Sequence, residues 1–367
     1  MNKAIYLCAA AALAMASCSN DELVEVAKND TINFRTVVGL NTKGAETTTA
    51  NFNTKELWVT TFLPGSNAAK LFNEKQYKLV DGSWTGHQYW GDNASLTFYL
   101  TSPGLKDWAV ADALTATSKD IEGVMVKDKI NDQIDYVYAE TTIAKPTSTT
   151  PSIVTLKHAM SQIQIKAKNS GSYKYEVKGI RISNVSSKGN FNLSTGIWSS
   201  LNDVKKYEVV YDSPRELTSD AQDIMIAKSV STEDNAMLIP QTTTPWIAPN
   251  KDAAATGSYI SVLVNITTDA GAAVYPKGST ASAKTYGWVA VPVTFNWTSG
   301  NKYIYTLDFT KGAGRVDPVD PGEGVKPKPE GPDPDKGEPV LGNDMIKFTV
   351  TVDTWTSQNQ PGTDMKP

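Results

Sequence analysis

The chain has 367 residues, a formal net charge of −4 and a pI near 5.4. This length is enough for a sizeable core and typically holds two domains, and the absence of a basic stripe argues against nucleic acid as a partner. Its two cysteines, Cys8 and Cys18, both lie near the N-terminus. The rest of the chain must therefore fold by core burial alone, without disulfides.

A hydrophobic leader opens the chain. Lys3 precedes an apolar run at residues 4–16, which is too short to span a membrane, and no later run is longer. The small residues before Cys18 resemble a bacterial lipobox, in which Cys18 carries lipid, although Met15 stands where leucine is usual. The alternative is an ordinary cleaved signal with an incidental Cys18. The acidic pair at 21–22 resembles the surface-export signal of Bacteroidetes lipoproteins.

The first strand is expected at residues 31–38. Ile32 and Phe34 lie on one face of this strand, and Asn33 and Arg35 lie on the other. Such a strand can bury one face in a groove and leave the other face in water.

The N-terminal half continues with apolar and polar residues in alternation, the pattern of β-strands. Asp81-Gly82 favours the type I′ turn of a hairpin. Residues 105–129 are ambiguous and can hold a short helix. A Ser/Thr/Pro-rich break at 147–151 suggests a domain boundary. The strands expected in this half are 57–63, 77–80, 83–84, 95–100 and 135–139.

The second half carries the clearest alternation, at residues 161–168, which predicts a strand with one buried and one wet face. The apolar phase shifts by one at Gly179, which is typical of a β-bulge. Residues 312–343 are rich in proline and charge, so they are unsuited to a packed core and predict an extended linker or a long loop. The other strands expected here are 173–177, 180–182, 260–266, 289–297 and 303–309.

A last strand follows at 345–355. Its inward face is expected to carry Ile346, Phe348, Val350 and Val352, with Trp355 at its end. Short strands separated by Gly, Pro and Asn predict an all-β protein of two β-sandwich domains. The expected division is a signal peptide at 1–17, a tether at 18–29, an N-terminal sandwich at 30–150 and a C-terminal sandwich at 151–367.

Motifs for catalysis and metal binding are missing. The two histidines, His87 and His158, have no cysteine, second histidine or spaced carboxylates beside them, so we expect no catalytic residue, no metal site and no cofactor. There is no nucleophile elbow, phosphate loop or zinc-protease motif. Trp84, Tyr89 and Trp90 can stack on sugar rings, but hairpin aromatics more often cover a β core, which is the interpretation we favour.

Five motifs follow one another along the chain. They are LKHAMSQI at 156–163, KGIRISNV at 178–185, MLIPQ at 237–241, WTSGNKYIY at 297–305 and FTVTVDTW at 348–355. This ordered set resembles the fimbrillin family, the pilins of type V pili. The resemblance implies two transthyretin-like β-sandwich domains and a lipoprotein precursor that is exported to the cell surface.

The resemblance also implies a processing step. In that family a protease cuts after an arginine and removes the lipidated first strand, and the vacated groove accepts a C-terminal strand from the next subunit. Here residues 31–38 match the removable place-holder, and residues 346–355 match the donor. The junction after the first strand has Lys43 where the family commonly has arginine, and Arg35 lies inside the strand, so both are candidate processing sites. A sandwich without one strand can be completed by β-augmentation.

Alternatives remain for both the strand and the protein. The last strand can instead complete its own sheet, with the proline-rich segment as a surface loop. We expect a non-enzymatic structural subunit or tip adhesin of a fimbrium at the cell surface and outer membrane, which mediates adhesion. Its expected partners are other pilin subunits, the outer membrane through the lipid anchor, and a host or bacterial surface ligand. The alternatives are a glycan-binding surface lipoprotein, a non-polymerising lipoprotein of the same fold, and a hydrolase whose carboxylates meet only on folding.

Overall fold

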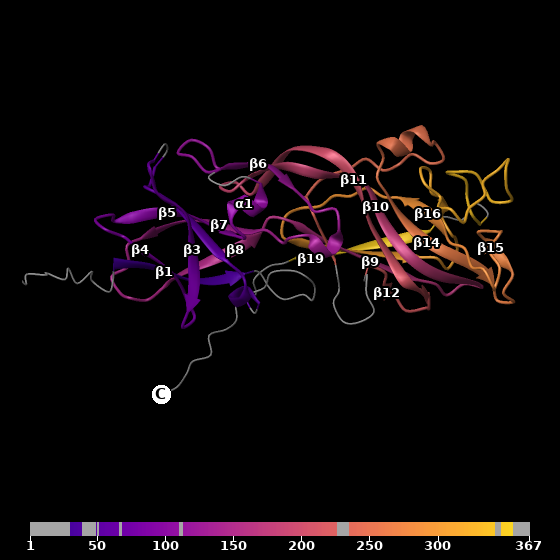
Figure 1. The fold of residues 1–367 in the computed structure, drawn as a ribbon, viewed down its shortest axis with the longest axis horizontal. Coiled ribbons are helices and arrows are strands. Elements are labelled where there is room, and N and C mark those ends of the chain that lie inside the picture. Colours follow the sequence, from indigo (N-terminus) through magenta and orange to yellow (C-terminus); the bar gives the residue numbers. More distant parts are fainter. Residues whose placement is uncertain are drawn as a thin grey trace, which may run out of the picture.

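A computed structural model describes residues 30–38, 49, 51–65, 68–109, 113–225, 235–341 and 346–354. These residues are nearly all in strands and loops, so the expected all-β class is confirmed. The molecule is elongated, with the N-terminal strands at one end and the C-terminal sheets at the other (Figure 1). Within the described residues, no helix has the length and apolar character of a membrane span. The short helices are α1 (Leu105–Trp108) and three 3₁₀ turns at Phe52–Thr54, Ile130–Asp132 and Asp252–Ala255.

The N-terminal strands close into a barrel in the order β1-β4-β3-β2-β5-β7-β8. The parallel pair of β1 and β8 completes the closure. The hairpin of β3 and β4 turns at Asp81 and Gly82, whose φ angles of 49° and 75° fit the expected type I′ turn. The strands are β1 (Thr31–Val38), β2 (Leu57–Phe62), β3 (Lys70–Val80), β4 (Ser83–Tyr89), β5 (Ser95–Ser102), β7 (Val137–Ala144) and β8 (Ser152–His158).

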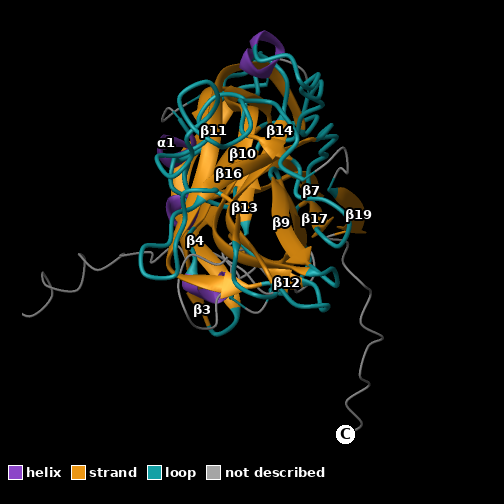
Figure 2. Cartoon of the chain, turned by 90° about the vertical axis from the view of Figure 1, so that its right-hand side faces the viewer, coloured by secondary structure: helices purple, strands orange, loops and turns teal. Residues whose placement is uncertain are grey.

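Two sheets form the C-terminal part (Figures 1 and 2). One has the order β11-β10-β14-β16-β18, with β6 on β10 and β15 on β14, and the other has the order β12-β9-β17-β19, with β13 on β9. The strands are β6 (Asp120–Met125), β9 (Ser161–Lys168), β10 (Tyr173–Asn192), β11 (Ile197–Glu216), β12 (Gln222–Asp223), β13 (Ala236–Leu238), β14 (Tyr259–Thr268), β15 (Ala273–Tyr275), β16 (Gly287–Pro292), β17 (Asn301–Asp308), β18 (Arg315–Val316) and β19 (Lys347–Thr354).

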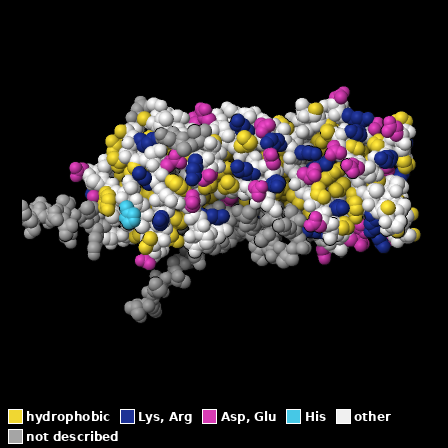
Figure 3. Space-filling model, viewed as in Figure 1, with side chains coloured by type: hydrophobic (Ala, Val, Ile, Leu, Met, Phe, Trp, Pro, Cys, Tyr) yellow, Lys and Arg dark blue, Asp and Glu magenta, His cyan; other side chains and the backbone are white. Residues whose placement is uncertain are grey.

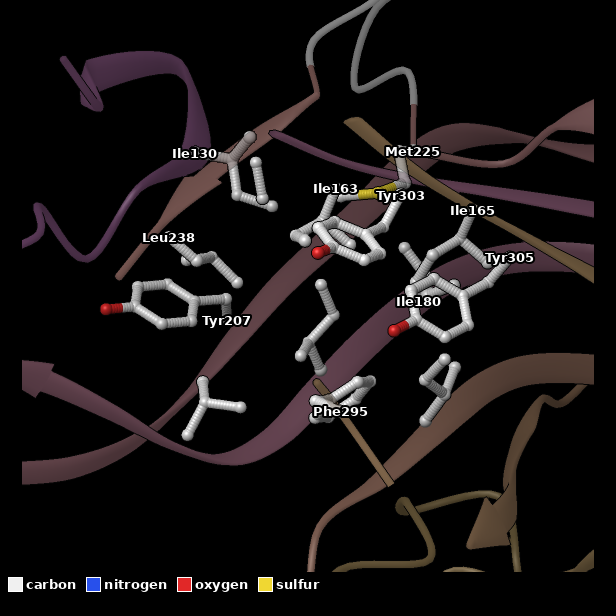
Figure 4. Close-up of a cluster of buried hydrophobic side chains, with 14 of the residues drawn as sticks. Ile130, Ile163, Ile165, Ile180, Tyr207, Met225, Leu238, Phe295, Tyr303 and Tyr305 are labelled. Carbon is white, nitrogen blue, oxygen red and sulfur yellow. The ribbon is translucent and has the colours of Figure 1, made fainter. Parts of the chain in front are cut away.

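The two C-terminal sheets pack face to face across a common core. In Figure 4, Tyr303 and Tyr305 of β17 lie in one cluster with Ile180 of β10 and Phe295. The bulge expected at Gly179 is confirmed, because the pairing of β10 with both β11 and β14 shifts between Val177 and Gly179. This part of the chain is therefore a sandwich in which β17 supplies large aromatic side chains to the core.

Two strands pack with the part of the protein on the other side of the boundary expected between residues 150 and 151. β8 follows that boundary in sequence, yet Val154 and Leu156 are buried in the barrel core. β6 precedes it, yet β6 pairs with β10 of the C-terminal sandwich. The Ser/Thr/Pro-rich break is thus the loop between two barrel strands, β7 and β8.

The proline-rich segment is folded onto the sandwich rather than extended. β18 pairs with β16, and Val325 is buried. The carboxylate of Asp317, which is 1% exposed, accepts the backbone N–H groups of Val319 and Asp320, and the fully buried Asp333 accepts those of Lys277 and Lys326. The expectation that this composition excludes packing is wrong here, because buried carboxylates satisfy the backbone donors of the loop.

Candidate functional site

The first strand, β1, fills a groove of the barrel between β4 and β8. Its inward side chains Ile32, Phe34 and Val38 are at most 1% exposed. The ring of Phe34 lies 5.4 Å from the ring of Tyr77 and 5.2 Å from that of Phe98, between centroids. Burial raises the pKa of the Tyr77 hydroxyl far above its usual value, so this group stays neutral. Removal of β1 would leave an apolar slot with an open strand edge on each side.

Polar contacts hold both ends of β1. At its start, the backbone N–H of Trp90 donates to the carbonyl of Asp30 at 2.8 Å, and the Asp30 carboxylate lies 2.5 Å from Nζ of Lys145. At its end, Oγ1 of Thr49 accepts the N–H of Val38 at 2.9 Å and donates to the Val38 carbonyl at 2.7 Å. These contacts fix the register of the strand.

A hydrogen bond also reaches the inward face of β1. Nε1 of Trp84 donates to Oγ1 of Thr36 at 3.0 Å, and Trp84 is only 4% exposed. The Trp84 ring packs against Phe52, with 5.2 Å between centroids. An open groove of about 500 Å³ runs beside this contact. Its lining residues are Arg35, Thr36, Val37, Thr49, Phe52, Asn53, Leu79, Gly82, Trp84 and Ile153.

The candidate processing residues differ in their surroundings. Arg35 is exposed on the outer face of β1, but its backbone is part of the strand, opposite Ile153 of β8. Lys43 lies outside the described residues, as do Cys18 and Trp355. A strand paired on both sides cannot enter a protease cleft without local opening.

The last strand, β19, lies at an edge and, within the described residues, pairs only with β17. Figure 2 shows it at the side of the sandwich, next to β17. Phe348, Val350 and Val352 lie opposite the buried Leu307, Tyr305 and Tyr303 but are themselves 37%, 42% and 49% exposed. Ile346, just before the strand, is 3% exposed. β19 thus continues the inward face of its sheet beyond the region that the opposite sheet covers.

The segments that hold the first and last strands are identical at five of ten aligned residues. Residues 29–38 read NDTINFRTVV, and residues 343–352 read NDMIKFTVTV. Asn, Asp, Ile, Phe and the final Val recur at the same places, an offset of 314 residues. The match places Phe348 at the position of Phe34 and Asp344, which lies outside the described residues, at the position of Asp30. Sequence reasoning found both strands but missed this repeat, although the signal is in the sequence.

Of the three aromatic residues that were expected to cover the core, Trp84 and Trp90 are buried and Tyr89 is exposed. Trp84 and Trp90 are 4% and 1% exposed, whereas Tyr89 is 46% exposed, so the two tryptophans offer no platform for a sugar. We predict that Trp90→Ala destabilises the barrel by about 3–5 kcal/mol, because its ring packs on Phe98 and truncation leaves a cavity. Denaturant unfolding followed by fluorescence measures this, with Tyr89→Ala as the exposed control. An unchanged unfolding midpoint for Trp90→Ala would contradict the burial.

The side chain of His158 pairs with a buried carboxylate. Its Nδ1 lies 3.0 and 2.9 Å from the two carboxylate oxygens of Asp135, and both side chains are almost fully buried. Among the described residues, no three His, Cys, Asp or Glu side chains are placed to hold a metal ion. On the face seen in Figure 3, basic and acidic side chains are interspersed rather than gathered into a basic stripe.

A family model described as fimbrillin-like matches residues 27–323. No curated protein matches the chain at a significant level. The solved structures that match this chain include a "putative cell adhesion protein" from Bacteroides ovatus, with 15% identity, a TM-score of 0.43 and coverage of 90% of this chain and 99% of that one.

A second "putative cell adhesion protein", from Parabacteroides distasonis, has 10% identity and a TM-score of 0.46, covering 89% of this chain and 99% of that one. A fimbrial assembly protein of the same species has 9% identity and a TM-score of 0.34, covering 76% of this chain and 92% of that one. Because these scores are below 0.5, the family assignment rests on the family model alone.

Proposed function

This chain belongs to the fimbrillin-like family, and we propose that it is a non-enzymatic structural subunit or tip adhesin of a surface fimbrium. In this proposal the chain is exported as a lipoprotein anchored through Cys18. A protease then removes β1, and the vacated barrel groove receives the last strand of a neighbouring subunit. Its partners are other pilin subunits, the outer membrane before processing, and a ligand on a host or bacterial surface.

The contrast between two strands of the same pattern supports this function above all. A donor strand must leave its own sheet at low cost and fit a foreign groove well. Among the described strands β19 pairs on one edge only, with β17, and three of its apolar side chains are 37–49% exposed. β1, with the same order of Ile, Phe and Val, pairs on both edges and is buried.

The energetic balance favours exchange once β1 is gone. In the groove, Phe348 and Val352 would change from half-exposed to buried at the places of Phe34 and Val38, which is worth roughly 1 kcal/mol each by apolar area. The strand would also gain a second ladder of backbone hydrogen bonds, one with β4 and one with β8. Removal of the first strand takes Asp30 away from Lys145, and Asp344, at the matching position, would supply a carboxylate to Lys145 in its place.

A monomeric surface lipoprotein of the same fold is the second candidate. Two observations favour it: β19 is already paired with β17, and Lys43 stands where the family commonly has arginine. Electron microscopy of expressing cells, with and without the surface protease, separates the two. Filaments that require the protease support the fimbrial subunit, and bare cells that carry the protein in both conditions support the monomer.

Limited proteolysis tests the processing step. We predict that trypsin cuts the folded chain after Lys43 and spares Arg35, because the backbone of Arg35 is held between β4 and β8. Mass spectrometry of the products identifies the site. A primary cut after Arg35 would show that β1 opens more readily than its pairing implies.

Lipid attachment is a separate prediction. Cys18→Ala is expected to move the protein from the membrane fraction to the soluble fraction, because the lipid would be lost. Stable anchoring takes more than one acyl chain, so metabolic labelling with fatty acid should mark the wild type strongly. Absence of label on the wild type, with unchanged membrane association of Cys18→Ala, would show that the leader is an ordinary cleaved signal.

A further inference from the structure

The strand match contains one chemical difference on the inward face. Ile32, Phe34 and Val38 correspond to Ile346, Phe348 and Val352, which are identical. At the third inward position, however, Thr36 corresponds to Val350. The difference exchanges a hydroxyl group for a methyl group at nearly the same volume.

That position faces a polar group of the barrel. Trp84 of β4 donates its Nε1–H to Oγ1 of Thr36 at 3.0 Å, and Trp84 is 4% exposed. Most of the Trp84 side chain is buried, although the contact borders the open groove, so the loss of this acceptor costs the free energy of the hydrogen bond. A valine in place of Thr36 would leave the indole N–H without this acceptor.

The register that brings Val350 to this place is constrained. Phe34 fits between Tyr77 and Phe98, so a phenylalanine belongs there, and Phe348 is the phenylalanine of β19. A shift of two residues would place Ile346 or Val350 in that site and leave a cavity. The acidic residue four positions earlier meets Lys145 only in the unshifted register.

We propose that Trp84 is a specificity-determining residue of the groove and favours strands with threonine or serine at the third inward position. This inference rests on the proposed strand exchange. The preference of Trp84 for a hydroxyl group makes the chain's own first strand a better occupant of the barrel groove than its own last strand. The preferred donor is then the strand of a subunit that carries a hydroxyl residue there, so that mixed assembly is favoured over self-assembly.

Peptide binding tests the proposal on a chain whose first strand has been released by a specific protease site in place of residues 42–45. The probes are fluorescent peptides of residues 29–38 and 343–354. We expect Thr36→Val to weaken the first peptide, and Val350→Thr to tighten the second, each by about five- to tenfold. The control is Val352→Thr, which should bind more weakly than the wild-type peptide, because position 38 is 1% exposed and a hydroxyl group placed there is removed from water.

The same peptides are then measured on the strand-released protein that carries Trp84→Phe, which completes a double-mutant cycle. Without the indole N–H, the affinity differences between the threonine and valine peptides should disappear. Equal affinities of the threonine and valine peptides for the protein with Trp84 would overturn the proposal. Affinity differences that persist in the Trp84→Phe protein would overturn it as well. If the 29–38 peptide binds and the 343–354 peptide does not, exchange with the chain's own last strand is wrong, while Thr36→Val still decides the role of Trp84. Failure of every peptide to bind would overturn strand exchange and this inference together.

Discussion

Phe348→Ala is expected to abolish assembly of the processed subunit while leaving the subunit itself folded. In its own sheet Phe348 is 37% exposed, so its truncation should destabilise the subunit by about 1–2 kcal/mol, less than the loss of a fully buried phenylalanine. In the groove of a neighbour it would take the fully buried place of Phe34, where truncation costs about 3–5 kcal/mol. That is more than about a hundredfold in affinity.

Two measurements on one preparation check this result. Denaturant unfolding reports the stability of the subunit, and electrophoresis without boiling reports the ladder of assembled subunits. Thr349→Ala is the matched control, because Thr349 is on the opposite face of β19 and is exposed. Normal ladders from Phe348→Ala would mean that β19 does not enter the groove.

Phe34→Ala is expected to destabilise the unprocessed barrel by about 3–5 kcal/mol, since its ring packs on Tyr77 and Phe98 in the core. Arg35→Ala, one residue further on and exposed, should stay within about 0.5 kcal/mol. Unfolding of the chain with β1 in place measures both. If the two variants unfold alike, β1 is not an integral strand of the barrel.

Local patterns in the sequence predicted much of the fold. Alternation at Ile32 and Phe34 predicted a half-buried strand, Asp81-Gly82 predicted the hairpin turn, and the phase shift at Gly179 predicted the bulge. Each of these features is set by side-chain period or by backbone angles at one or two residues, so the sequence carries it directly.

Features that depend on distant partners were not predictable in this way. The alternation of β9 suggested one wet face, yet Gln162 and Gln164 on that face are at most 2% exposed, and the Gln164 amide donates to the Asp223 carboxylate. The pairing of β6 with β10 across the expected domain boundary likewise depends on tertiary packing. A buried polar residue such as Gln164 can be satisfied by a partner from another strand, and period alone does not reveal that partner.

The candidate site also has features that the sequence predicted and features that it did not. The sequence located both strands of the proposed exchange, because each alternates cleanly. It did not reveal that Phe348, Val350 and Val352 are half-exposed in their own sheet, since that depends on where the opposite sheet ends. Nor did it reveal the hydrogen bond between Trp84 and Thr36, whose residues are 48 positions apart.

A disulfide between subunits tests strand exchange most directly. A chain that starts at residue 19 lacks both native cysteines, so introduced ones report alone. In the proposed register Thr349 takes the place of Arg35, which lies opposite Ile153 of β8. Paired Cα atoms of neighbouring strands lie within disulfide range. We predict that Ile153→Cys with Thr349→Cys forms covalent ladders after release of β1 and none before, whereas Ile153→Cys with Lys347→Cys forms none. Absence of ladders from the first pair after release, or equal ladders from both pairs, would contradict exchange of β19 for β1.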